Sequence, residues 1–187
     1  GHALTRLADQ RPDVVGLSAD LAKYTDMHIF RDAHPARFFQ MGMAEQALLG
    51  AAAGLAEVGL VPFASTYSVF ATRRAYDFLC LDIAEPVLNV NIVGGLPGLT
   101  TGYGPSHQAT EDVAILRGCP NLTIVDPCDS VDIEQAVPAL AASPASLIVI
   151  VAPRSRVVGT QFVQADRGPI YSGERSRDDG AMRAMSG

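Results

Sequence analysis

The sequence predicts an α/β protein in which a mostly parallel β-sheet lies between layers of helices. Short and nearly continuous apolar runs alternate along the chain with longer segments of helical periodicity. Such runs are typical of strands buried on both faces, and their alternation with helices is typical of a layered α/β domain. The chain has 187 residues, 48% of them hydrophobic, so it is long enough to bury one sizeable core.

The elements can be placed in order along the chain. The first is an amphipathic helix in the opening residues GHALTRLADQ. Strands are expected at 13–18, 37–42, 60–65, 86–95, 122–127 and 146–153. Helices are expected at 45–58, 68–84, 109–118 and 130–142, with capping or first-turn residues at Ser68, Thr110 and Ser130.

The end of the chain differs from the rest. From about residue 155 the apolar residues follow neither the helical nor the strand periodicity, and 168–187 is polar and contains glycine. We therefore expect one domain over 1–154, followed by an irregular tail over 155–187 that packs loosely.

Composition excludes several classes of function. The net charge is −6 with a pI near 5.1, and no basic stripe is present, which argues against nucleic acid as a partner. No apolar run approaches the roughly 18–20 residues that span a bilayer, so no membrane partner is expected. The three cysteines are odd in number and lack metal-ligand spacing, which favours a reducing compartment, the cytoplasm.

Ligands of open parallel sheets bind at the carboxyl ends of the strands, here the loops after 42, 65, 95 and 127. The loop 94–108, GGLPGLTTGYGPSHQ, contains five glycines and two prolines, which is unusual for a simple connector. His107 follows this glycine-rich stretch. A lone loop histidine is usually exposed, but this position favours acid–base chemistry or contact with a polar substrate.

Glu45 opens the apolar helix EQALLGAAAGLAEVG. The simplest interpretation is a first-turn acid that stabilises the helix dipole by about 0.3–1 kcal/mol. However, Gly50 and Gly54 lie one turn apart among alanines, which lets another backbone approach closely. A carboxylate on such a packed helix must be partnered or protonated, which indicates a functional role.

The segment STYSVFATRRAYDFL places Tyr67, Phe70 and Arg73 at successive spacings of three, near one helical face. An aromatic pair at this spacing is more often core than a ligand platform. A buried Arg73 would need an acid or an anionic ligand. Arg74 and Asp77 have the spacing of a surface ion pair, which contributes little to stability. The chain contains no GxGxxG, Walker or triad motif.

Five motifs together resemble the pyrimidine-binding domain of the transketolase family of thiamin diphosphate enzymes. They are GLSADL (16–21), RFFQMGMAEQ (37–46), STYSVFATRRAYD (65–77), GYGPSHQATEDVAILRGCPNLTIVDPCD (102–129) and APR (152–154). The resemblance covers about residues 3–154. It implies a three-layer thiamin diphosphate-binding fold with a mostly parallel sheet flanked by helices.

The resemblance implies roles for the residues that match the cofactor-binding motifs. Glu45 matches the glutamate that hydrogen-bonds the N1′ nitrogen of the aminopyrimidine and promotes its imino tautomer. Tyr67 and Phe70 match the aromatic positions that line the pyrimidine pocket. Asp20 matches an acid that lies near the cofactor at a subunit contact.

Other matched positions imply substrate contacts. His107 matches a histidine that contacts substrate oxygens, and Arg73 an arginine near the substrate in the deoxyxylulose-phosphate synthase branch. Arg154 aligns with an arginine that binds a substrate phosphate. Two positions depart from the pattern: Tyr103 replaces an aspartate that meets a donor hydroxyl, and Gly95 replaces a histidine.

The resemblance also implies a partner. The sequence lacks the GDG…N motif that holds Mg²⁺ and the diphosphate, and the family's C-terminal domain does not follow the PR strand. The expected function is the pyrimidine-binding subunit of a transketolase-like enzyme, which transfers a two-carbon ketol unit between sugar phosphates. It would be active only with a diphosphate-binding N-terminal subunit, as a homodimer or heterotetramer.

Three alternatives remain open: a subunit of a deoxyxylulose-phosphate synthase-like enzyme, a subunit of a 2-oxoacid-decarboxylating thiamin enzyme, or a truncated, non-catalytic binding or assembly module.

Overall fold

The computed structural model describes residues 1–143, 146–151 and 161–164, and within them seven strands form one sheet. The order across the sheet is β2-β1-β3-β4-β6-β5-β7. Neighbouring strands are parallel, except that β7 is antiparallel to β5. The bounds are β1 Val14–Ser18, β2 Phe38–Gln40, β3 Val61–Tyr67, β4 Asn91–Gly95, β5 Leu122–Asp126, β6 Ser146–Val151 and β7 Gln161–Gln164.

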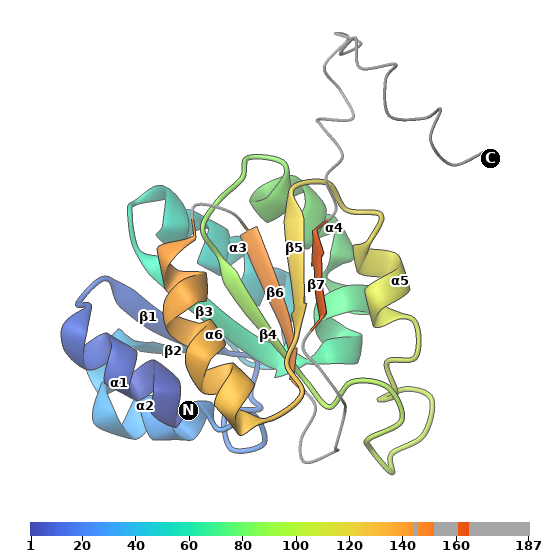
Figure 1. Ribbon diagram of the computed structural model, residues 1–187, viewed down its shortest axis with the longest axis horizontal. Coiled ribbons are helices and arrows are strands. Elements are labelled where there is room, and N and C mark those ends of the chain that lie inside the picture. Colours follow the sequence, from blue (N-terminus) through green and yellow to red (C-terminus); the bar gives the residue numbers. More distant parts are fainter. Residues whose placement is uncertain (144–145, 152–160, 165–187) are drawn as a thin grey trace, which may run out of the picture.

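Helices cover both faces of the sheet. Helices α1, α2 and α6 gather on one face, while α3 and α4 lie on the other (Figure 1). The helices are α1 His2–Gln10, α2 Met27–Ala33, α3 Glu45–Glu57, α4 Tyr76–Phe78, α5 Asp112–Leu116 and α6 Ser130–Ala142, with a 3₁₀ turn at Pro35–Arg37 and π-helical turns at Phe70–Arg74 and Leu79–Ala84. No helix in the described ranges has the length and apolar character needed to cross a bilayer.

Side chains alternate between the two faces of each strand and build two cores. On β1, Val14 packs in the cluster of α1 and α2, whereas Val15 packs in the larger cluster beneath α3. Gly16 faces α2, and a Cβ there would lie 2.8 Å from ring carbons of Phe30. The strand and the helix therefore approach more closely than a side chain would permit.

The expected fold class is confirmed, and most elements lie within a few residues of their expected bounds. The structure adds α2, which the apolar pattern does not predict, and replaces a single helix over 68–84 by short α and π turns. Ser130 is the first residue of α6, which agrees with its expected place in the first turn, and the cap itself is Asp129, whose side chain accepts hydrogen bonds from the amides of Val131 and Asp132.

The strand β7 lies inside the stretch 155–187, which the sequence predicts as irregular. Its four residues pair with β5 at the edge of the sheet. The remainder of that stretch lies outside the described residues, so the proposed domain boundary stays a prediction.

Candidate functional site

Glu45 begins α3 and lies buried among the apolar residues at the carboxyl edge of the sheet. Only 1% of the residue is exposed. Its Oε2 accepts a hydrogen bond of 2.9 Å from Nη1 of Arg74. The expectation that this acid needs a partner is therefore confirmed, and an arginine in the π-helical turn provides it. A buried carboxylate without such a donor would be strongly unfavourable.

The partner of Glu45 also stacks on an aromatic ring. The guanidinium carbon of Arg74 lies 4.4 Å from the centroid of Phe70. Arg74 thus places a flat cation over a ring face while donating to a buried carboxylate. Its side chain remains 44% exposed. The predicted surface pair of Arg74 with Asp77 is wrong, because Arg74 turns toward α3 instead.

Tyr67 and Phe70 form the predicted aromatic pair. Their ring centroids are 6.0 Å apart with the planes inclined by 20°, which is a stacked arrangement. Tyr67 is 4% exposed, and burial raises the pKa of its hydroxyl. The helical-face argument for this pair is only partly correct, because Tyr67 ends β3 and Phe70 begins the π-helical turn.

The glycine-rich loop folds back on itself and brings His107 to this pair. Gly98 and Ala109 exchange two backbone hydrogen bonds of 2.9 and 3.0 Å, which close the loop at its base. The imidazole of His107 meets the Phe70 ring edge-on, with centroids 5.2 Å apart. Nδ1 of His107 lies 2.9 Å from the hydroxyl oxygen of Ser106.

Tyr103 from the same loop lies next to His107, with ring centroids 5.3 Å apart. Its side chain is among the most exposed of the large apolar residues, at 68%. The phenol therefore stands at the outer side of the histidine, where it can contact a ligand that reaches the site from solvent.

Arg73 turns away from Glu45 toward α5. It forms a two-point ion pair with Glu111, including a 2.7 Å contact from Nη2 to Oε2, and Nη1 donates to the carbonyl of Pro105 at 3.1 Å. Its guanidinium holds the pKa of Glu111 down at about 2. Arg73 is half-exposed rather than buried. An open depression of about 280 Å³ separates the two arginines, lined by Val69, Phe70, Arg73, Arg74 and Ser106.

Asp20 does not join this group through a direct contact in the described structure. It follows β1 with a left-handed φ of 59°, and its Oδ1 accepts a 3.1 Å hydrogen bond from Nε2 of Gln40 at the end of β2. At Gly95, a Cβ would lie 3.1 Å from the methyl carbon of Thr25. A larger side chain at this position would therefore have to displace Thr25. Arg154 lies outside the described residues.

Sequence reasoning missed two side chains that organise the site, Arg74 and Glu111. Arg74 is 29 positions from Glu45, and Glu111 is 38 positions from Arg73, so no local spacing links either pair. The sequence signal for the pair with Glu45 was the adjacent arginines Arg73 and Arg74, because an acid buried on α3 needs a donor and either arginine could provide it.

A buried hydrogen bond holds the turn that carries Phe70 and Arg74 in place. The hydroxyl of Ser68 donates to Oδ2 of Asp112 at 2.7 Å, and both residues are buried. A Cβ on Gly94 would lie 3.2 Å from Cα of Ser68, so β4 and the residue that follows β3 pack closely there. These contacts connect the turn that carries Phe70 and Arg74 to β4 and α5.

The combined geometry can hold a flat, hydrogen-bonding heteroaromatic ring. It offers one buried carboxylate, an aromatic face and an imidazole at the rim, all at the carboxyl edge of a parallel sheet. A carboxylate in an apolar wall can share a proton with a ring nitrogen, whereas a hydrated carboxylate would do so weakly.

Comparison with known proteins gives a family match over most of the chain. The family model described as "Transketolase, pyrimidine binding domain" matches residues 1–158. A putative uncharacterised transketolase family protein, y4mN, from Sinorhizobium fredii is 70% identical over 142 residues, covering 76% of this chain and 41% of the relative. A putative transketolase C-terminal section from Methanocaldococcus jannaschii is 43% identical over 130 residues, covering 69% and 41%.

Further matches extend the comparison. A solved structure described as a split gene transketolase, an inactive beta4 tetramer, is 41% identical with a TM-score of 0.73, covering 81% of this chain and 48% of that one. A 1-deoxy-D-xylulose-5-phosphate synthase from Microcystis aeruginosa is 33% identical over 183 residues, covering 96% and 29%. The chain thus spans less than half the length of each of these relatives.

Proposed function

The chain belongs to the transketolase family, whose pyrimidine-binding domain it contains, and on this premise we propose that it is the pyrimidine-binding subunit of a split thiamin diphosphate enzyme. The reaction proposed is transfer of a two-carbon ketol unit between sugar phosphates. The motif positions, the stacked aromatic pair and the similarity to a split gene transketolase support this proposal.

The observation that carries the proposal is the buried contact between Glu45 and Arg74. The guanidinium makes the two contacts that an aminopyrimidine ring would need, a hydrogen bond to Glu45 and a contact over the face of the Phe70 ring. The residues therefore fit a flat nitrogen heterocycle. Binding of such a ring requires that Arg74 release Glu45 or share its carboxylate.

The side chains of the site then have distinct roles in the proposal. Glu45 holds a proton at N1′ of the pyrimidine, and Tyr67 and Phe70 orient the ring. When bound, thiamin diphosphate supplies the thiazolium carbon to which a two-carbon unit can be attached. His107 faces the substrate from the closed loop and holds or delivers a proton at a substrate oxygen.

The residues proposed to bind the substrate around Glu45 and His107 differ in how readily each could contact a substrate phosphate. Arg73 already pairs with Glu111, so it can bind a phosphate only by sharing that acid or exchanging it. Tyr103 stands exposed beside His107 and offers a hydroxyl in place of a carboxylate. Asp20 is proposed to approach the cofactor from the edge of β1, and Arg154 to bind a substrate phosphate.

We also propose that a separate diphosphate-binding subunit completes the site. The 187 residues contain no GDG…N sequence that would hold Mg²⁺ and a diphosphate, and the carboxylate and rings described here offer no equivalent. Two of the similar proteins support a divided enzyme, because one is described as a transketolase C-terminal section, from M. jannaschii, and the other as a split gene transketolase. The solved split transketolase is a beta4 tetramer described as inactive, and this agrees with the proposed division of the site.

The helix α3 is proposed as part of the subunit contact, in a homodimer or heterotetramer. A Cβ on Gly54 would meet no described atom within 4 Å, so this position faces open space. A Cβ on Gly50 would lie at ordinary contact distance, 3.8 Å, from side-chain atoms of Phe78 and Asp82. The free part of the glycine face is therefore around Gly54, and Gly54→Leu should weaken self-association in sedimentation experiments.

Calorimetry and reconstitution test the proposal. The chain alone should bind thiamin diphosphate and Mg²⁺ negligibly, and binding should appear when the diphosphate-binding polypeptide is added. In the reconstituted complex, Glu45→Gln should abolish turnover with ketose phosphates. Glu134→Gln, at an exposed position of α6 and outside the proposed contacts of α3, is the matched control and should leave turnover unchanged. Near-normal turnover of Glu45→Gln would refute the role of Glu45.

The synthase-like activity is a second candidate, because a deoxyxylulose-phosphate synthase matches 96% of the chain. Product analysis separates the two candidates. Incorporation of pyruvate with release of CO₂ would indicate the synthase-like or decarboxylating reaction, whereas transfer from a ketose phosphate without CO₂ supports ketol transfer. If neither reaction occurs although the complex forms and binds the cofactor, the chain is a non-catalytic assembly module.

A further inference from the structure

Two free cysteines lie in contact at a place that the proposed site does not use. The Sγ atoms of Cys80 and Cys119 are 2.9 Å apart, and the thiol of Cys80 donates to the sulfur of Cys119. A disulfide needs its sulfurs at about 2.05 Å, so bond formation requires a movement of about 0.9 Å. Cys80 lies in the π-helical turn Leu79–Ala84, and Cys119 lies in the turn between α5 and β5.

The two thiols have unequal surroundings. Cys80 is partly exposed, whereas Cys119 is 1% exposed and packs in the main core. When Cys80 ionises, the thiol of Cys119 donates a hydrogen bond to it, which lowers the pKa of Cys80 to about 7, with help from the hydroxyl of Tyr76. The same contact raises the pKa of Cys119. Cys80 is therefore the nucleophile and Cys119 the resolving thiol.

Tyr76 forms the third side of this cluster. While Cys80 is a thiol, the Tyr76 hydroxyl donates to the carbonyl of Ile115 at 3.3 Å, and its single proton turns to the sulfur when Cys80 ionises. Burial raises the pKa of the phenol to about 12. The phenol thus keeps its proton at neutral pH and remains a donor. It connects the turn that carries Cys80 to the end of α5, just before Cys119.

We propose that Cys80 and Cys119 form a peroxide-reactive dithiol site, which is oxidised to an intramolecular disulfide and returned to two thiols by a dithiol reductant. The juxtaposition of a partly exposed cysteine and a buried one, with their sulfurs 2.9 Å apart, carries this inference. Cys128, the third cysteine, lies beyond β5 at the start of α6 and is outside the pair.

The oxidation proceeds in two balanced steps. The Cys80 thiolate attacks one oxygen of hydrogen peroxide, the O–O bond breaks, and hydroxide leaves and becomes water, so that Cys80 is a sulfenic acid. The sulfur of Cys119 then attacks the Cys80 sulfur, the S–O bond breaks, and the oxygen leaves as water with the Cys119 proton. Two thiols and one peroxide yield one disulfide and two waters, with two electrons passing to the peroxide.

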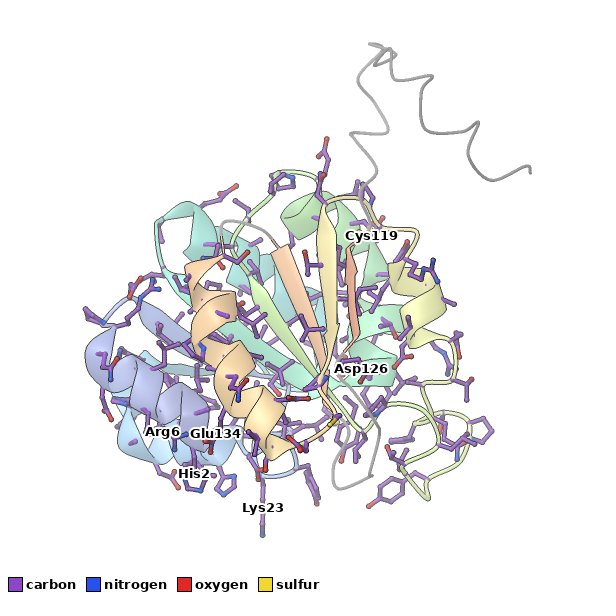
Figure 2. The ribbon with its side chains drawn as sticks, in the orientation of Figure 1. His2, Arg6, Lys23, Cys119, Asp126 and Glu134 are labelled. Carbon is purple, nitrogen blue, oxygen red and sulfur yellow. The ribbon has the colours of Figure 1, made fainter. Side chains whose placement is uncertain are left out.

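The site lies at the opposite edge of the sheet from the candidate pyrimidine pocket. Figure 2 shows Cys119 and Asp126 at opposite ends of β5, and Asp126 marks the carboxyl edge. The cross-link would enclose the chain between positions 39 apart, including the loop 94–108. It would therefore restrain the unfolded chain without touching Glu45 or the aromatic pair.

Thiol counting on the full chain tests this proposal. One equivalent of hydrogen peroxide should reduce the number of titratable thiols in denaturant from three to one, and dithiothreitol should restore three. Peptide mass spectrometry of the oxidised chain should find the Cys80–Cys119 cross-link. Its melting temperature should exceed that of the reduced chain by about 5 °C or more, because a closed loop of this length restricts the unfolded state.

Matched variants make the outcome decisive. Cys128→Ser should behave as wild type and lose both remaining thiols. Cys80→Ser should lose the cross-link, the rise in melting temperature and the rapid reaction. Cys119→Ala, the variant at the buried position, should leave Cys80 as a sulfenic acid that a dimedone probe captures. If the Cys128→Ser chain keeps two thiols after peroxide treatment, or if Cys80 proceeds to sulfinic acid without cross-linking, the proposal is wrong.

Discussion

Replacing Arg74 by methionine should destabilise the chain more than replacing the buried acid with which it pairs. Arg74→Met keeps an unbranched side chain over Phe70 but removes the donor to Glu45. The carboxylate, only 2% exposed on its side chain, then loses its hydrogen bond in a largely desolvated position. In Glu45→Gln the buried group is a neutral amide, and Arg74 can reach solvent because its side chain is 44% exposed.

The magnitudes follow from this asymmetry. Removing one partner of a fully buried pair costs about 3–5 kcal/mol, and the half-exposed position of Arg74 reduces this to about 2–3 kcal/mol. Glu45→Gln should cost about 1 kcal/mol, because a neutral hydrogen bond replaces a charged one. The double variant should cost about 1–2 kcal/mol, since neither an unpaired carboxylate nor a charged pair remains.

Urea unfolding of the four chains, followed by circular dichroism, measures these differences. At about 2–4 °C per kcal/mol, Arg74→Met should lower the melting temperature by about 4–12 °C. The coupling energy of the cycle should be at least about 1 kcal/mol. If the two single variants are additive, or if Arg74→Met costs no more than Glu45→Gln, the assignment of Arg74 as the partner of a buried charge is refuted.

Three further predictions test other parts of the structure. Gly16→Ala should destabilise the chain by about 1–3 kcal/mol in urea unfolding, because its Cβ would lie 2.8 Å from the ring of Phe30, and a neutral effect would contradict this packing. Arg73 depresses the pKa of Glu111 to about 2, so the pair stabilises the fold above pH 4.5 and ceases to do so as pH falls toward 2. The difference in melting temperature between wild type and Glu111→Gln should therefore be constant from pH 8 to 5 and vanish near pH 2, whereas a difference that persists there would contradict the pairing. Alkylation of Cys80 by iodoacetamide should reach half its maximal rate near pH 7, and a midpoint above pH 8 would indicate an ordinary thiol.

Local patterns were sufficient for the elements whose side chains face the core. The helix α3 and the helix α6 were expected at 45–58 and 130–142, and the structure has them at Glu45–Glu57 and Ser130–Ala142. In both, small and apolar residues dominate a long segment, so the prediction depends on many positions at once. The aromatic pair Tyr67 and Phe70 was also found, because the two residues are three positions apart.

The elements that sequence reasoning missed depend on contacts between distant segments. Helix α2 has seven residues, too few for a clear period, and is held by burial of Met27 and Phe30 against β1 and α1. Strand β7 has four residues and exists as a partner of β5. The π-helical turn at Phe70–Arg74 shifts the direction of successive side chains, so a count in threes could not tell which arginine meets Glu45.

The two hydrogen bonds between Gly98 and Ala109 have a consequence for how the glycine-rich loop 94–108 can change. Both are backbone bonds, so they do not depend on the side chains of residues 99–108, which lie between them. The interior of the loop, including Tyr103 and His107, can therefore be exchanged as a cassette while its two anchor points stay in place. Ten consecutive residues could then diverge or be redesigned without altering the sheet or the buried carboxylate of Glu45.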